Sequence, residues 1–238
     1  MLLLLLLASL TVTTVRGNTE KAIFLGPPAA NISSAHPTLD DLNIDTLTPQ
    51  DFTVRTHLEA QFPSDAFEYG KATWLVLDEL TEGQRYEVRV CWAATQPTAF
   101  RMNTYELQTV FETPELISDL SEYSRSRQPA VDKPSGEKPG SAKLSGVASA
   151  SERQASVLLL QVLAAADYYT MNKTLMRDVP PVHVDIILDP FLLNVLPRSL
   201  APTVIYIIVV AIASWFLAQL ISTKIRQIPM EPSQKKSQ

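Results

Sequence analysis

The chain has 238 residues, 46% of them hydrophobic, with 20 Lys and Arg against 25 Asp and Glu and a formal net charge of −5 at pH 7. This mildly acidic balance contains no basic patch of the kind that binds nucleic acid, so a nucleic-acid partner is not expected. Cys91 is the only cysteine, which excludes an intramolecular disulfide. The core must therefore hold by packing, and Cys91 is either buried and inert or paired with another chain.

An apolar run opens the chain. Leu2 to Leu7 are followed by small and β-branched residues, with Val15 and Gly17 at the −3 and −1 positions of a cleavage site. This pattern predicts a secretory signal peptide over residues 1–17. An uncleaved anchor is disfavoured, because the apolar part is shorter than the ~20 residues that a membrane span needs.

Short apolar runs bounded by Pro and Gly follow the signal peptide. They are typical of β-strands, because β-branched and aromatic residues are frequent and no long 3.6-residue period occurs before the C-terminal region. The expected strands are residues 21–25, 51–60, 72–77, 84–92 and 98–111.

The segment "LDELTEGQRYEVRVCW" is the most informative about the fold. One face of its strand carries Tyr86, Val88, Val90 and Trp92, and the other carries Glu87, Arg89 and Cys91. Two leucines, a turn at Gly83 and a Tyr that opens the next strand resemble the tyrosine corner of fibronectin III-like and immunoglobulin-like sandwiches. The predicted fold is therefore mainly β: a lumenal antiparallel β-sandwich over residues 18–198, plus one C-terminal transmembrane helix. An antibody-type domain is excluded, because there is no Cys–Trp–Cys framework.

Residues 124–155 change to Pro, Gly, Ser, Ala and mixed charges, which predicts a disordered insertion within the sandwich domain. Two more strands are expected after it, in "SVLLLQVLAAADYYTMN" (residues 156–172) and "PPVHVDIIL" (residues 180–188). In the first of these a helix competes with the strand, because Leu and Ala favour helix.

An apolar and proline-rich segment, "DPFLLNVLPRS" (residues 189–199), follows the last strand and is called the juxtamembrane segment below. Its prolines keep the backbone extended and remove hydrogen-bond donors, so we expect neither a continuous helix nor a strand of a ladder. No polar alternation shelters its apolar side chains in the sandwich. Two interpretations stay open: a linker that rests among lipid headgroups, or a surface that docks on a partner protein, oriented by Asp189, Asn194 and Arg198.

No charge occurs between Arg198 and Lys224, and this apolar interval predicts a transmembrane helix over residues 199–223. Four basic residues follow the span and one precedes it, so the tail, residues 224–238, is expected in the cytosol and the N-terminal domain in the lumen. Trp215 lies near the middle of the span beside a pair of small residues, Ser214 and Ala218, which is compatible with a helix–helix contact. The candidate interface residues are Asp189, Pro190, Phe191, Leu193, Asn194, Pro197, Arg198 and Trp215.

Several short signals concern modification and address. Asn31 in "NIS" and Asn172 in "NKT" are glycosylation sequons on the lumenal side. The C-terminal "KKSQ" places Lys235 and Lys236 where coat machinery reads a dilysine retrieval signal, which predicts residence in the endoplasmic reticulum membrane as a single-pass type I protein. The alternative is two solvated lysines that attract anionic lipid.

Motifs of catalysis are absent from the sequence. His36, His57 and His183 are scattered without metal-ligand spacing, and there is no phosphate loop, nucleophile elbow or Cys–His pairing. The carboxylates Asp40, Asp41, Asp78, Glu79, Asp185 and Asp189 allow a glycosidase pair by number alone, but solvated loop acids are the expected assignment. We therefore predict a chain that is not an enzyme by itself and takes no cofactor or metal.

Three stretches, "NTEKAIFLGPP", "YEVRVCWAATQPTAF" and "ILDPFLLNVLPRSLAPT", resemble the fungal GPI-mannosyltransferase II co-activator family. The resemblance covers most of the chain outside residues 124–155 and the tail, and none of its motifs is catalytic. It implies a non-catalytic subunit of the endoplasmic reticulum whose partner is the polytopic mannosyltransferase that adds the second mannose to the GPI precursor. The partner would use dolichol-phosphate mannose as donor. No ligand residues carry over, and residues 189–198 remain the expected interface.

Two rival classes remain. A cargo receptor of the p24 type, or another accessory subunit of that kind, would carry a lumenal cysteine pair, a heptad stretch before the membrane and an aromatic signal in the tail, and "TKIRQIPMEPSQKKSQ" has no aromatic residue. A membrane-tethered glycosidase is third, and release of sugar by the purified lumenal domain would support it.

Overall fold

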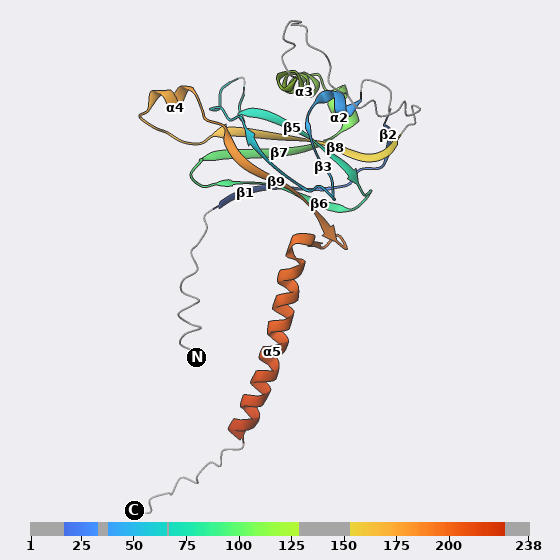
Figure 1. Ribbon diagram of the computed structural model, residues 1–238, viewed down its shortest axis with the longest axis vertical. Coiled ribbons are helices and arrows are strands. Elements are labelled where there is room, and N and C mark those ends of the chain that lie inside the picture. The colour runs from blue at the N-terminus through green and yellow to red at the C-terminus, as the bar shows by residue number, and fades with distance from the viewer. Residues whose placement is uncertain (1–16, 33–37, 66, 129–152, 227–238) are drawn as a thin grey trace, which may run out of the picture.

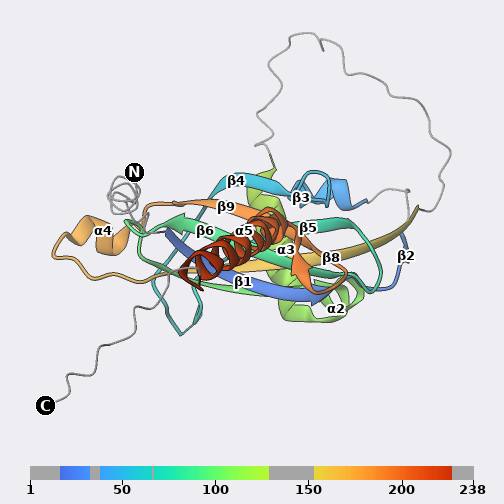
Figure 2. The ribbon, with the colours of Figure 1, turned by 90° about the horizontal axis from the view of Figure 1, so that it is seen from below.

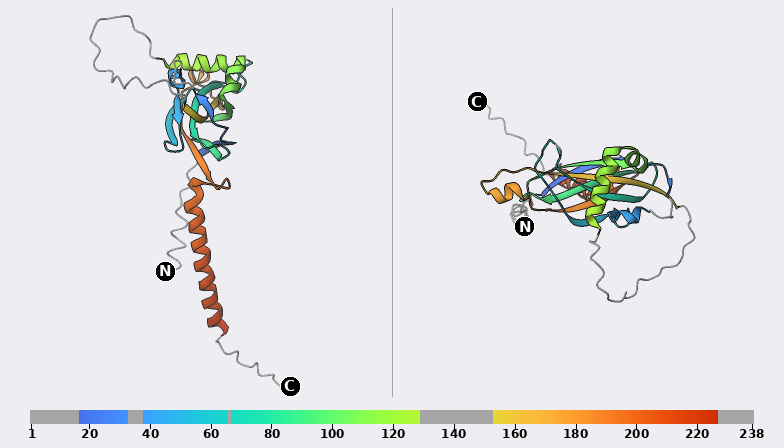
Figure 3. Two further views of the ribbon diagram at one scale, coloured as in Figure 1. Left: turned by 90° about the vertical axis from the view of Figure 1, so that its right-hand side faces the viewer. Right: turned by 90° about the horizontal axis from the view of Figure 1, so that it is seen from above.

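The computed structural model describes residues 17–32, 38–65, 67–128 and 153–226. Two β-sheets pack face to face, two helices cover one side of the pair, and a long helix projects from the opposite side (Figure 1). Figure 3 shows the same order from the side, with the covering helices and the long helix at opposite ends of the molecule. The predicted mainly β sandwich with one C-terminal apolar helix is confirmed.

The first sheet lies on the side from which the long helix leaves (Figure 1). Its strands pair antiparallel in the order β1, β6, β9 and β4, with β10 continuing along β9 beyond the start of β4. Their bounds are β1 Gly17–Leu25, β6 Arg85–Ala93, β9 Val182–Leu192, β4 Thr53–Leu58 and β10 Leu196–Pro197.

The second sheet has β8 at its centre, flanked by β5 and β7. The strand interpretation of residues 156–172 is therefore confirmed as far as Ala166 and is wrong beyond it. Strand β3 pairs parallel with β5, and β2 pairs antiparallel with the start of β8. The bounds are β7 Thr98–Glu106, β8 Arg153–Ala166, β5 Lys71–Leu80, β3 Asp45–Leu47 and β2 Ala30–Ile32.

The main core lies between the two sheets. Alternate residues of β6 point into it, as the period of two predicts, and those of β9 do the same. The fully buried members with less than 2% exposure include Leu58, Leu75, Leu77, Tyr86, Val88, Leu160, Ile186 and Leu188.

The predicted tyrosine corner is confirmed. The backbone N–H of Thr81 donates to the hydroxyl of Tyr86 at 2.9 Å, and that hydroxyl lies 3.0 Å from Oε1 of Gln84. Leu77 and Leu80 are both buried beneath this turn. The bond ties the β5–β6 turn to the start of β6, as in other β-sandwiches.

Two helices that the sequence analysis did not foresee cover the outer face of the second sheet. Helix α2 (Leu107–Glu112) follows β7 directly, so the expected strand over residues 98–111 is wrong beyond Glu106. Helix α3 (Pro114–Arg127) has 14 residues, so the expectation of no helix before the span is also wrong. A second core forms beneath them from Trp74, Val76, Val110, Leu120, Ala155, Val157 and Leu159. Both faces of β5 are therefore covered, and its residues from Thr73 to Leu77 are buried without alternation.

The insertion predicted over residues 124–155 is wrong at both ends, because its last three residues, 153–155, belong to β8 and its first residues to a helix. Residues 124–127 belong to α3, and Ser124 is buried with its hydroxyl donating to the carbonyl of Leu42 at 2.7 Å. The segment therefore connects a helix to β8, where two strands were expected to flank it. Its residues 129–152 lie outside the described residues, as do residues 1–16 of the predicted signal peptide and Lys235 and Lys236. Gly17, the last predicted signal-peptide residue, is the first residue of β1.

The remaining elements are short, apart from the C-terminal helix. They are the 3₁₀ helices η1 (Leu39–Leu42) and η2 (Arg198–Leu200) and helix α4 (Lys173–Arg177). Helix α5 runs from Ala201 to Arg226, directly after η2. Residues 198–226 form a helix long and apolar enough to cross a membrane, and none of its most apolar window is buried against the rest of the described chain. Seen from below, α5 starts beside β9 and projects away from the first sheet (Figure 2).

Candidate functional site at the junction of the sandwich and helix α5

The juxtamembrane segment is a β-hairpin, which corrects the expectation of a non-strand linker. Strand β9 continues through Pro190 to Leu192, and β10 returns beside it with Pro197 opposite Phe191. Proline is tolerated here for a geometric reason. The N–H of Leu188 donates to the carbonyl of Phe52, just before β4 begins. Pro190 is two residues later, so its nitrogen faces the same edge of β9, at a level where β4 is no longer present. Its missing donor therefore breaks no ladder bond.

The hairpin turns through two residues with positive φ, Leu193 at 52° and Asn194 at 59°. The N–H of Val195 donates to the carbonyl of Leu192 at 3.1 Å, so the four residues form a type I′ turn. Asn suits this conformation, whereas a leucine there costs about 1–2 kcal/mol because its Cβ crowds the backbone. Leu193 is thus held in a conformation that its own side chain disfavours.

Asn194 fixes the hairpin to the β5–β6 turn. Its Oδ1 accepts from the N–H of Arg85 at 2.8 Å, and its Nδ2 donates to the carbonyl of Gly83 at 2.9 Å. Beside it, Nε2 of Gln84 donates to the carbonyl of Phe191 at 3.2 Å. Both the oxygen and the nitrogen of the Asn194 side chain therefore bond within the chain, although the residue was expected to orient a partner.

The apolar residues of the hairpin differ widely in exposure, from the covered Phe191 to the side chains of the turn. Phe191 is 7% exposed, outside both core clusters, with the guanidinium carbon of Arg85 5.8 Å from its ring centroid. Leu193 is 95% exposed and Val195 is 77% exposed. We call these two side chains the hairpin tip. Of the proposed apolar contact residues, Leu193 is free to meet a partner and Phe191 is not.

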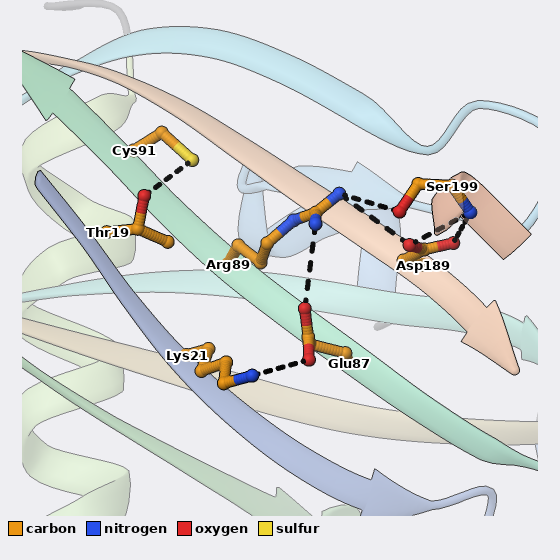
Figure 4. A network of polar contacts seen from close by, with 7 residues as sticks. All are labelled: Thr19, Lys21, Glu87, Arg89, Cys91, Asp189 and Ser199. Atoms are coloured by element: carbon orange, nitrogen blue, oxygen red, sulfur yellow. Dashed lines mark hydrogen bonds and ion pairs between the residues drawn. The ribbon is translucent and has the colours of Figure 1, made fainter. Parts of the chain in front are cut away.

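Asp189 connects the hairpin to the start of the C-terminal helix (Figure 4). Its side chain is buried at 5% exposure, and its two oxygens accept from the backbone N–H of Ser199 at 3.2 and 3.3 Å. A guanidinium nitrogen of Arg89 lies 3.6 Å from Oδ2 of the same carboxylate. Ser199 is in η2, directly before α5. The negative charge of Asp189 therefore lies near the positive N-terminal end of the α5 dipole, which is a favourable interaction.

The network continues across the outer face of the first sheet. The other guanidinium nitrogen of Arg89 lies 3.6 Å from Oε1 of Glu87, and Nζ of Lys21 lies 3.2 Å from Oε2 of that glutamate. Glu87 is 5% exposed, so three strands contribute to a partly buried ion network (Figure 4). The alternation in the sequence places Glu87 and Arg89 on this face but does not predict a role for either residue. Their alternation with the buried residues of β6 was the available signal.

Comparison with known proteins gives a match to a family. The sequence model of the family described as GPI-Mannosyltransferase II co-activator matches residues 8–221. This chain belongs to the GPI-mannosyltransferase II co-activator family. The suspected resemblance is therefore confirmed. Neither the curated proteins nor the solved structures contain a match.

Helix α5 of this co-activator-family member has no buried residue, and its Trp215 is 65% exposed. The rise of 1.5 Å per residue places Trp215 about 20 Å along the helix from Ala201. Trp215 and the hairpin tip are thus distant from each other, and the structure does not join them into one surface. Arg198 and Pro197 lie between the two, at the end of the hairpin, with Arg198 exposed and Pro197 half-buried.

The acidic residues singled out by sequence are dispersed. Asp78 pairs with Arg153 at 2.6 Å and Asp185 with Arg55 at 2.6 Å. Asp185 and Asp189 are four residues apart on one face of β9, which separates them by about 13 Å and exceeds the carboxylate spacing of glycosidases.

The histidines are less scattered than the sequence indicated. His57 and His183 are directly opposite each other on β4 and β9, with ring centroids 4.0 Å apart. His36 lies outside the described residues. Within the described ranges, no group of three or more His, Cys, Asp or Glu residues is placed to hold a metal ion.

The two sequon asparagines are both exposed. Asn31 is in β2, and Asn172 caps α4 by accepting from the N–H of Thr174 at 3.0 Å. Cys91 is half-buried with a free thiol, and the hydroxyl of Thr19 lies 3.5 Å from its sulfur. None of these residues belongs to the junction described above.

Proposed function

We propose that this family member is a non-catalytic, single-pass type I subunit of the endoplasmic reticulum membrane. It binds the polytopic mannosyltransferase that adds the second mannose to the GPI precursor, and the hairpin tip is its lumenal contact. Membership of a co-activator family supports an accessory role. The exposed, apolar helix α5 supports membrane insertion.

The observation that carries the interface is the conformation of Leu193. A large apolar residue is 95% exposed at a positive φ, and the hydrogen bonds of Asn194 hold the turn in that form. Strained positions of this kind persist where the surroundings determine them and are frequent at functional sites. Burial of Leu193 and Val195 against a partner would remove both side chains from solvent, which is a contribution of about 1.5–3 kcal/mol for each.

The rigid support of the tip favours a protein contact. The tip is joined to the β5–β6 turn through Asn194 and to α5 through Asp189, so its position relative to the membrane helix is fixed. A preorganised surface loses less conformational entropy on binding than a mobile linker does. The sandwich and α5 would then engage lumenal loops and membrane helices of the partner together.

Co-purification in mild detergent tests this proposal. The variant Leu193→Asp/Val195→Asp should lose the mannosyltransferase, because two charges would enter an apolar contact. The matched control is Met171→Asp, which changes another apolar residue that is 85% exposed, in the loop before α4. The control should retain the partner at the wild-type level. Equal recovery with both variants would place the tip among lipid headgroups and reject it as the contact.

A further inference from the structure

We propose that a cavity beside the start of α5 binds the phosphate group of a membrane lipid, with Arg198 as its main cationic contact. The cavity has a volume of about 270 Å³ and lies between the β3–β4 loop, the end of β9 and η2. Its lining includes Pro49, Phe52, Arg89, Asp189, Arg198 and Ser199. This site goes beyond the proposed function, because it concerns a small ligand of this chain alone.

The charges around the cavity leave one cation uncompensated. Lys21 and Arg89 are matched by Glu87 and Asp189 in the ion network. The guanidinium group of Arg198 forms no ion pair or hydrogen bond with any residue that the structure describes. The surroundings therefore favour a ligand with a single negative charge, which is the charge of a phosphodiester and of a singly ionised phosphomonoester.

A hydrogen-bond donor is available in the same place. The hydroxyl oxygen of Ser199, an exposed residue, lies 3.5 Å from a guanidinium nitrogen of Arg89 and accepts from it, so the hydroxyl hydrogen can be donated to a ligand. Phosphate oxygens accept several such bonds, and guanidinium groups are the preferred cationic partners.

The position of the cavity selects a lipid over a free phosphate. Arg198 is the first residue of the segment long enough to span a membrane, so the cavity lies at the depth of lipid headgroups when α5 is inserted. Phe52, which lines the cavity, is 50% exposed. Leu200, the residue after the lining residue Ser199, is 45% exposed. Apolar side chains beside cationic ones suit a molecule that carries acyl chains next to its phosphate.

Native mass spectrometry of the full chain, released from neutral detergent, tests the proposal with dioctanoyl phosphatidic acid as the probe. We expect saturable binding, and binding at least about tenfold weaker for Arg198→Gln, since a charge-assisted contact is lost. Arg177→Gln removes an exposed charge from α4, away from the cavity, and should bind like the wild type. Phe52→Ser, a second variant, should weaken binding of the lipid too.

Two further probes separate the sources of the phosphate. Dioctanoylglycerol, which lacks the phosphate, should bind at least about tenfold more weakly than the acid. Inorganic phosphate should fail to displace the lipid at equal concentration. Unchanged binding by Arg198→Gln, equal binding of dioctanoylglycerol, or displacement by equimolar inorganic phosphate would each overturn the proposal. Because the partner subunit is absent, these results are independent of the mannosyltransferase interface.

Discussion

The carboxylate of Asp189, near the end of β9, accepts hydrogen bonds from the backbone N–H of Ser199, ten residues later at the start of the C-terminal helix. The same carboxylate is paired with Arg89 of β6. The sandwich and the residues directly before α5 are therefore joined by a partly buried polar contact as well as by the chain. A partner bound to the hairpin tip would consequently have a fixed position relative to α5.

The first prediction concerns this contact. Asp189→Asn removes the charge opposite Arg89 and should lower the free energy of unfolding by about 2–4 kcal/mol, because a partly buried cation loses one of its anions. Asp185→Asn is the matched control on the same strand, in an exposed pair with Arg55, and should cost much less. Urea unfolding of the full chain in mild detergent measures both. Equal losses would show that Asp189 is no more important than a surface charge.

The tyrosine corner gives the second prediction. Tyr86→Phe leaves the N–H of Thr81 without its partly buried acceptor and should cost about 0.5–1.5 kcal/mol of stability. Tyr169→Phe removes a hydroxyl from a side chain that is 81% exposed and should change stability by less than about 0.5 kcal/mol. Thermal unfolding followed by circular dichroism compares the two. If Tyr86→Phe left the stability unchanged, the tyrosine corner would not contribute to the stability of the fold.

The third prediction separates stability from function at the hairpin. Leu193→Gly relieves the strain of the positive φ and should stabilise the chain by about 0.5–1 kcal/mol. The same change deletes the exposed side chain and should reduce recovery of the partner. Unfolding and co-purification are measured on the same preparation. A glycine variant that is less stable and binds normally would contradict both assignments.

The fourth prediction is a pH dependence. The Arg55 guanidinium, hydrogen-bonded to Asp185, lowers the pKa of that carboxyl below its ordinary value of 3.8. A depressed pKa contributes stability above the ordinary value and loses it as the pH falls through the folded value. The difference in unfolding midpoint between wild type and Asp185→Asn should thus be constant from pH 5 to 7 and shrink steadily as the pH falls below the ordinary value of 3.8. A difference that grows on acidification would contradict this sign.

Local patterns were sufficient to predict much of the sandwich. The alternation of Tyr86, Val88 and Val90 placed β6 and its buried face correctly, because a strand with one face in a core must repeat every two residues. The helices were missed although α3 carries recognisable signals. Pro114 occupies its first turn, Glu115 follows, and Arg125 and Arg127 are in its last turn. No helix was expected on the outer face of the second sheet. Pro114 and Glu115 therefore received no assignment, and Arg125 and Arg127 were assigned to the insertion.

The structure of the juxtamembrane segment could not be predicted from its own sequence. Its prolines indicated that the segment does not pair in a sheet. Whether the missing N–H of Pro190 breaks a ladder bond depends on where β4 begins, and β4 is far away in the chain. Phe191 is covered by contacts with the β5–β6 turn, and Asn194 is bound to the same turn. These contacts are non-local, so no pattern within the segment could distinguish the buried Phe191 from the exposed Leu193.

Site-specific photocrosslinking tests the central claim most directly. A benzoylphenylalanine at position 193, in native membranes, should crosslink to the polytopic mannosyltransferase, and the same group at position 169 should not. Tyr169 is a fair control because its side chain is also mostly exposed, at 81%. Crosslinks from position 193 to lipid alone, with none to the mannosyltransferase, would contradict the assignment of the hairpin tip as the partner contact.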